Sequence, residues 1–179
     1  MPQNQKLKQL EARLLSLEKN LIGKDMVILI WGPGKKDKNY SKREDIKREL
    51  QQRFPEADVF FSEEKQARKQ TRNSYPSLID EELAHATAAD IIFALDTSKG
   101  VGEEISVYSE YSQIRGKLIV LSHVKYRRVN TFPAALRRCL HLEYYSDEDY
   151  SSCNIAKKIC TKHVNAFLLR RIAERGSIQ

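Results

Sequence analysis

The chain has 179 residues and a formal net charge of +7. A chain of this length can bury roughly two-thirds of its unfolded surface, so we expect one domain with a substantial core. No run approaches the roughly 18 apolar residues of a membrane span, and the polar N-terminal segment lacks the apolar centre of a signal peptide. We therefore expect a soluble cytoplasmic protein with no membrane partner. Three cysteines without a C-x-x-C pair argue against a disulfide framework.

Leucines near the N-terminus repeat at alternating steps of three and four: Leu7, Leu10, Leu14, Leu17 and Leu21. This spacing predicts an amphipathic helix that packs against another helix. The chain therefore divides into residues 1–23, a helix that stops at Gly23, and residues 24–179, an α/β domain. The helix either caps the domain or pairs with a second copy, so a homo-oligomer is expected.

Apolar runs alternate with capping signals along the rest of the chain. We expect strands at 26–31, 59–61, 91–95, 117–121 and 140–145. Expected helices run from a capping box at Ser41 to about 54, from a weaker cap at Ser77 through 86, over 103–114, briefly at 132–134, and from about 147 to 174. Residues 62–72 form either a flexible segment or a surface helix. This order predicts an α/β fold with a doubly wound, mostly parallel five-stranded sheet of the flavodoxin or Rossmann type.

Loops at the carboxyl ends of parallel strands are where open α/β sheets bind ligands. The loop after the first strand, Trp31-Gly32-Pro33-Gly34, matches neither a Walker motif nor a dinucleotide fingerprint, which argues against a kinase or a dehydrogenase. Its glycines allow the backbone to approach a flat ligand closely, and Trp31 can wall the pocket.

The loop after the third strand carries two adjacent glutamates, in Gly100-Val101-Gly102-Glu103-Glu104-Ile105. We expect both glutamates in the first turn of a helix, where the helix dipole favours the ionised carboxylate. An ionised carboxylate in a partly closed pocket can meet an electron-deficient carbon. Alternatively, both glutamates only complement the dipole on a solvated helix start.

Several motifs between Met26 and Leu121 occur in one order: Gly32-Pro33-Gly34, Glu82-Leu83 ahead of Ala89-Asp90-Ile91, the Gly100 to Ile105 segment, and Gly116-Lys117. In this order they resemble the nucleoside 2-deoxyribosyltransferase family and its nucleoside or nucleotide N-glycosidase relatives. The resemblance places Glu104 on the nucleophilic glutamate and Glu82 on the acidic residue that handles the base, with Asp96 as a weaker candidate acid.

The resemblance implies cleavage or transfer of a bond between a sugar and a base in a nucleoside, nucleotide or dinucleotide. The transition state is similar to an oxocarbenium ion, which a carboxylate stabilises or traps. No cofactor and no metal are expected. The predicted substrate-binding residues surround the same edge: Trp31, Gly32, Gly34, Asp96, Ser98, Gly100, Gly102, Glu103 and Tyr108.

Two alternatives remain open. Ser106 and Tyr108 stand where the family has small residues, and Ser98 stands where many members have an aspartate, which favours a non-catalytic module that senses a nucleotide or binds a partner. The other alternative is a TIR-type NAD hydrolase, which shares the parallel sheet and the catalytic glutamate. Domains of the resembled kind also occur as antiphage-defence effectors, and the resemblance extends that expectation to this chain.

Four small basic groups lie outside these motifs, at residues 68–72, 125–128, 137–138 and 170–171. They either bind nucleic acid or a nucleoprotein partner or form solvated surface. Arg43 either reaches a phosphate or lies on a solvated helix face. Cys153, Cys160 and His163 could share a helix face and hold a metal, but buried thiols are the preferred interpretation. Asp90 is expected to accept hydrogen bonds from the backbone.

Overall fold

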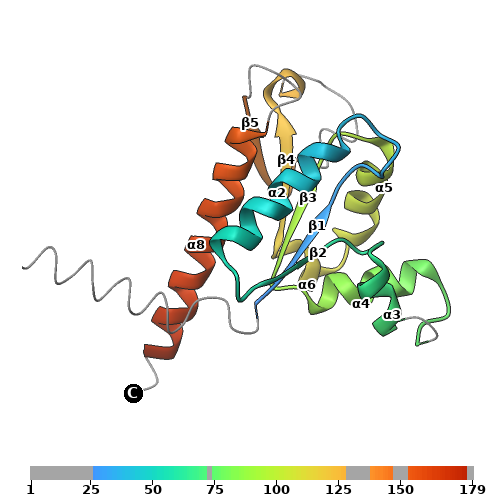
Figure 1. Cartoon of the computed structure of the whole chain (residues 1–179), viewed down its shortest axis with the longest axis horizontal. Helices are drawn as coiled ribbons and strands as arrows, with labels where there is room; N and C mark the ends of the chain where they lie inside the picture. The colour runs from blue at the N-terminus through green and yellow to red at the C-terminus, as the bar shows by residue number, and fades with distance from the viewer. Residues whose placement is uncertain (1–25, 72–73, 128–137, 147–152, 177–179) are drawn as a thin grey trace, which may run out of the picture.

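The computed structural model describes residues 26–71, 74–127, 138–146 and 153–176 (Figure 1). The predicted helices at 1–23 and 132–134 lie outside these residues. Five parallel strands form one sheet in the order β2-β1-β3-β4-β5. The strands are β1 (Val27–Trp31), β2 (Asp58–Phe60), β3 (Ile91–Leu95), β4 (Leu118–His123) and β5 (His141–Tyr145). The predicted parallel α/β sheet is therefore confirmed.

Helices cover both faces of the sheet. They are α2 (Tyr40–Arg53), α3 (Lys65–Thr71), α4 (Leu78–Ala88), α5 (Lys99–Tyr108), α6 (Ser112–Arg115), the 3₁₀ turn η1 (Val124–Tyr126) and α8 (Asn154–Gly176). Figure 1 shows α2 and α8 on one side of the strands and α4, α5 and α6 on the other. The segment 62–72, for which the sequence left two alternatives, contains the helix α3.

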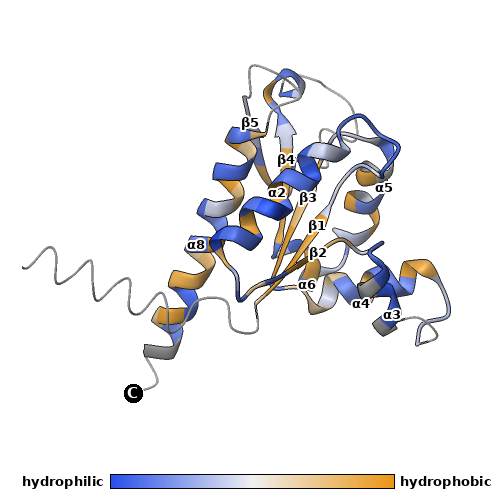
Figure 2. Cartoon of the chain, viewed as in Figure 1, coloured by the Kyte–Doolittle hydropathy of each residue, from blue (hydrophilic) through white to orange (hydrophobic). Residues whose placement is uncertain are grey.

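Two apolar cores lie on opposite faces of the strands, which are the most apolar part of the molecule (Figure 2). Successive side chains of a strand point to opposite faces. Ile28 and Ile30 of β1 accordingly pack in the core with α2 and α8, whereas Leu29 and Trp31 pack in the core with α4, α5 and α6. The alternation therefore directs Trp31, the last residue of β1, toward α5.

The start of α2 differs from the prediction. Its N-cap is Asn39, and no side chain caps this end, so the capping box predicted at Ser41 is wrong and Ser41 lies within the first turn. Ile46 and Leu50 are buried as predicted. The cap predicted at Ser77 is confirmed, since its side chain accepts a hydrogen bond from the backbone N–H of Asp80 at 3.2 Å.

The helix predicted over 103–114 is wrong at both ends. Ser98 is the N-cap of α5 and accepts a hydrogen bond from the backbone N–H of Val101, so the helix begins at Lys99 and includes both glycines of the expected loop. It ends at Tyr108, and α6 follows as a separate short helix. No acidic residue lies in the first turn of α5. Glu104 therefore gains little from the helix dipole, which acts mainly on the terminal turn.

The C-terminal helix α8 buries two of the cysteines. Cys153, just before it, and Cys160 lie in the core with α2, as predicted for thiols on the inner face of an amphipathic helix. Asp90 also behaves as predicted, since its carboxylate accepts a hydrogen bond from the backbone N–H of Val27 at 2.8 Å. Within the described part of the chain, no helix combines the length and apolar character needed to cross a membrane.

Candidate functional site

A cavity of about 270 Å³ lies where the strands β1, β2 and β3 end. It collects side chains from the loop after β1, from α2, from the residues after β2, from α4 and from the start of α5. The lining residues are Trp31, Gly32, Gly34, Arg43, Ser62, Glu63, Glu82, Ser98, Gly100, Val101 and Glu104. The sequence places these residues in five separate segments, and the parallel topology brings them to one edge of the sheet.

Most of the predicted site residues line this cavity: Glu104, Glu82, Trp31, Gly32, Gly34, Ser98 and Gly100. Four others do not. The side chain of Glu103 is 66% exposed and forms an ion pair with Lys99. Asp96 accepts a hydrogen bond from the hydroxyl of Ser122 at 3.5 Å.

The other two residues outside the lining belong to α5. The carbonyl of Gly102 accepts a hydrogen bond from the hydroxyl of Ser106 at 2.8 Å. Tyr108 is buried behind the cavity. These two positions, with Glu103 and Asp96, therefore stay outside the set of residues that face the hollow.

Among the described carboxyl groups, Glu104 has the pKa that its surroundings raise furthest. Burial, followed by the negative charge of Glu82, raises the pKa of Glu104 to about 8, although Arg43 acts in the opposite direction. The cavity therefore holds Glu104 mainly in its protonated form at neutral pH. The ionised ground state expected from the helix dipole is wrong, because α5 starts one turn earlier and burial dominates.

Glu82 is held by Tyr108, which does not itself line the cavity. The Tyr108 hydroxyl donates a hydrogen bond to Oε2 of Glu82 at 3.1 Å, and the Tyr108 ring lies 5.2 Å from the Trp31 ring between centroids. Tyr108 follows Glu104 by four residues on α5, so both side chains project from the same side of the helix. Tyr108 therefore acts as a support for Glu82 and Trp31.

Three polar atoms of the cavity lining are buried without a hydrogen-bond partner among the described residues. They are Nε1 of Trp31, the hydroxyl oxygen of Ser62 and Oε2 of Glu104. Buried polar atoms are nearly always paired, and an unpaired one costs about 1–3 kcal/mol. A donor, a hydroxyl and a carboxyl oxygen are thus available together to a polar ligand.

Arg43 is the main residue that the sequence interpretation missed, since it is neither solvated nor free to bind a phosphate. Its side chain is buried and forms a two-pronged ion pair with both carboxylate oxygens of Glu63. It also donates to the carbonyl of Ile30, with Nη2 at 2.8 Å, and more weakly to the carbonyls of Gly32 and Pro33. Its spacing of three and seven residues from Ile46 and Leu50 places it on the buried face of α2, a pattern that the sequence contains.

Gly32 is required by this arrangement. A Cβ atom at position 32 would lie 2.7 Å from Cδ of Arg43, well inside van der Waals contact. Because the guanidinium is held at its far end by Glu63 and by backbone carbonyls, the arginine side chain has no free direction in which to retreat. The glycine therefore permits the close contact between the loop after β1 and α2.

Two larger hollows exist among the described residues. One of about 490 Å³ lies between α2 and α8, and one of about 390 Å³ lies beside β2, α3 and α4. Neither lies at the carboxyl ends of the central strands, and neither contains a carboxyl group whose pKa burial raises so far. Size alone does not identify the site, and we assign it to the cavity around Glu104.

The comparisons with known proteins find similarity in fold but not in sequence. No protein-family model matches the chain, and no curated protein matches it in sequence. The fold is similar to that of a solved structure of the CMP N-glycosidase BcmB of Clostridium botulinum, with a TM-score of 0.48 and 15% sequence identity. The similar region covers 76% of this chain and 98% of that chain.

Proposed function

We propose that this protein cleaves the N-glycosidic bond of a nucleoside or nucleotide, with Glu104 as the carboxylate that meets the anomeric carbon. The observation that carries the proposal is the placement of Glu104 and Glu82 in one small cavity at the carboxyl edge of a parallel sheet. The order of the sequence motifs, which resembles that of nucleoside deoxyribosyltransferases and N-glycosidases, gives independent support.

The reaction breaks the bond between the anomeric carbon and the base nitrogen, and the bonding electron pair leaves with the base. Ionised Glu104 stabilises the positive charge on the sugar or forms an ester with it, and water or another hydroxyl then takes the sugar. Glu104 must lose its proton before it acts. Glu82, whose charge helps to raise the pKa of Glu104, is the neighbouring carboxylate that can take this proton and pass it to the leaving nitrogen.

The size of the cavity favours a small substrate. Its volume of about 270 Å³ lies just below the roughly 300–1,000 Å³ of typical small-molecule pockets. A nucleoside or a mononucleotide suits this volume better than a dinucleotide does. This observation favours a nucleoside-type substrate over the NAD expected of a TIR-type hydrolase.

The test is to incubate the protein with a panel of nucleosides, nucleotides and NAD and to measure the released free base by chromatography. Wild type should release base from at least one mononucleoside or mononucleotide, and Glu104→Gln should release none. Glu103→Gln is the matched control, because the neighbouring glutamate has the same chemistry but an exposed side chain. Equal release by wild type and Glu104→Gln, or release from NAD alone, would contradict the proposal.

The second candidate is a module that binds a nucleotide without turnover. The hydrogen bond from Tyr108 favours it, because this bond occupies one oxygen of Glu82 that proton transfer to a leaving base would use. A nucleotide that raises the melting temperature while no base appears would support this candidate, since a ligand specific for the folded state stabilises it. Assembly into oligomers, nucleic-acid binding and a defence role remain proposals that rest on the N-terminal leucines, the basic groups and the sequence resemblance.

A further inference from the structure

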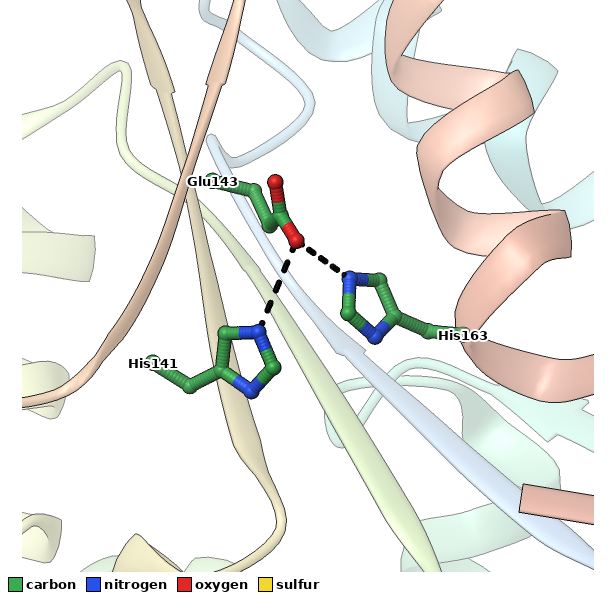
Figure 3. Close-up of side chains that lie close together, drawn as sticks. All are labelled: His141, Glu143 and His163. Carbon is green, nitrogen blue, oxygen red and sulfur yellow. Dashed lines mark hydrogen bonds and ion pairs between the residues drawn. The ribbon is translucent and has the colours of Figure 1, made fainter. Parts of the chain in front are cut away.

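Three potential metal ligands converge at the far edge of the sheet, away from the cavity. The imidazoles of His141 and His163 both approach the same carboxylate oxygen of Glu143 (Figure 3). Nε2 of His163 lies 2.8 Å from Oε1 of Glu143, and Nε2 of His141 lies 3.5 Å from it. The two imidazole rings are nearly perpendicular, with centroids 4.8 Å apart.

The fold determines why these side chains meet. His141 and Glu143 are two residues apart on β5 and therefore point to the same face of the sheet, the face that α8 covers. His163 lies on α8, four residues after Ile159 and four before Phe167, which both pack against the core. The cluster thus joins the edge strand β5 to the helix that covers it.

The position of the cluster separates it from the proposed catalytic cavity. His141 opens β5 and pairs with Ile119 near the start of β4, so it lies toward the amino ends of the strands. The cavity lies at their carboxyl ends and is lined by segments that follow β1, β2 and β3. A ligand at the cluster would therefore act on the fold without touching the substrate.

Two imidazole nitrogens and one carboxylate oxygen form a donor set that suits a divalent zinc ion. Zinc binds such donors at about 2.0–2.2 Å in tetrahedral geometry, which places neighbouring donor atoms about 3.4 Å apart. The three donor atoms here lie within 4.8 Å of one another, so bringing them around one ion needs a displacement of the order of 1 Å. The side chain of His141 is 52% exposed and can make this adjustment without disturbing the core.

We propose that His141, Glu143 and His163 bind a Zn²⁺ ion, with water at the fourth position. β5 lies at the edge of the described sheet and pairs with β4 on one side. The ion would connect this edge strand to α8. Such a link stabilises the folded state, because the three ligands are brought together only when β5 and α8 have packed. This site differs from the one weighed in the sequence, which combined His163 with Cys153 and Cys160. Both of those thiols lie in the core.

The experiment is titration of the full-length protein with Zn²⁺ after removal of metal by a chelator. Calorimetry should give saturable binding of one ion with a Kd below about 10 μM, and the melting temperature should rise with zinc but not with Mg²⁺. His141→Ala should weaken binding by about a hundredfold or more, since loss of a ligand should cost at least as much as loss of an outer-shell partner. Because His141 is exposed, this variant should fold like wild type.

Cys139→Ser is the matched control, because this exposed thiol lies two residues before His141 and is the alternative zinc ligand nearest in sequence. It should bind zinc as wild type does. With Co²⁺ as a spectroscopic probe, the d–d bands should show four-coordinate geometry without a thiolate charge-transfer band. Binding no tighter than about 100 μM, unchanged affinity in His141→Ala, or loss of binding in Cys139→Ser would overturn the proposal.

Discussion

Replacing Glu104 with glutamine should stabilise the protein, and the gain should grow with pH. An unfolded glutamate titrates near 4.5, whereas Glu104 in the folded protein has a pKa of about 8. Between these values the folded state holds a proton that the unfolded state has lost, so the stability of wild type falls as pH rises through this window and levels off above it. The difference between the two pKa values corresponds to about 5 kcal/mol in total and to about 3 kcal/mol at pH 7.

Glu104→Gln keeps the shape of the side chain and removes the titration. We compare the free energy of unfolding of Glu104→Gln with that of wild type at two pH values. The advantage of the variant should be about 4 kcal/mol larger near pH 8.5 than near pH 5. Trp31 is the one tryptophan of the chain and lines the cavity, so its fluorescence reports urea unfolding at each pH. Glu103→Gln, which makes the same substitution at an exposed side chain, is the matched control.

The result that would refute this reasoning is a pH-independent difference between Glu104→Gln and wild type. A variant less stable than wild type near pH 8.5 would refute it as well. Either outcome would mean that Glu104 ionises in the folded protein as readily as an exposed glutamate. The cavity would then lack the enclosed character that raises the pKa of this carboxyl group.

Four further outcomes are expected. The proton that Glu104 passes through Glu82 to the leaving nitrogen is lost above pH 8, so kcat/KM for base release should fall as pH rises through about 8, and a rise to a midpoint near 8 would contradict this proton route. Arg43→Lys should lower the free energy of unfolding by about 3–5 kcal/mol, because lysine cannot reproduce the fork that holds Glu63, and unchanged urea unfolding would contradict this. Gly32→Ala should push Arg43 aside and lower the free energy of unfolding by about 1–3 kcal/mol. Gly34→Ala should not show this loss, because a Cβ at position 34 meets open space. Gly100→Ala should raise stability by about 1 kcal/mol, since nothing lies within 4 Å of the added Cβ, and a lower melting temperature would contradict it.

The sheet could be predicted because each strand is a short apolar run followed by turn or capping residues. Ile91 to Leu95, the central strand β3, matches the prediction at both ends and is buried throughout. Strands of this kind are buried on both faces, so their sequence is apolar without alternation and contrasts sharply with the loops. The parallel order then follows from the alternation of strands with helices.

The start of α5 could not be predicted as readily, because glycine is a poor helix former and two glycines there indicate a loop. Ser98 overrides that preference by capping the helix, and burial of Val101 and Ile105 supplies the packing that propensity does not. The same shift moved Glu104 out of the first turn. The burial that raises its pKa comes from the surrounding segments, which sequence spacing does not describe.

Arg43 and the cluster of His141, Glu143 and His163 show two different reasons why the sequence did not predict a contact. Arg43 lies at helical spacing with Ile46 and Leu50, so its burial was present in the pattern but a charged residue was assigned to solvent. The meeting of Glu143 with His163 depends on how α8 lies across β5, twenty residues away in the chain. No local pattern specifies that contact, because it follows from tertiary packing alone.

The two glycines in the first turns of α5 also affect how a ligand could reach the cavity. Each lowers the cost of unwinding this turn by about 1 kcal/mol relative to alanine, and the turn borders the hollow in which Glu104 lies. The remaining borders are the end of β1 with the loop after it, α2, the segment after β2, and α4. Fraying of this helix end would therefore widen the hollow, and amide hydrogen exchange should be fastest there among the segments that line it.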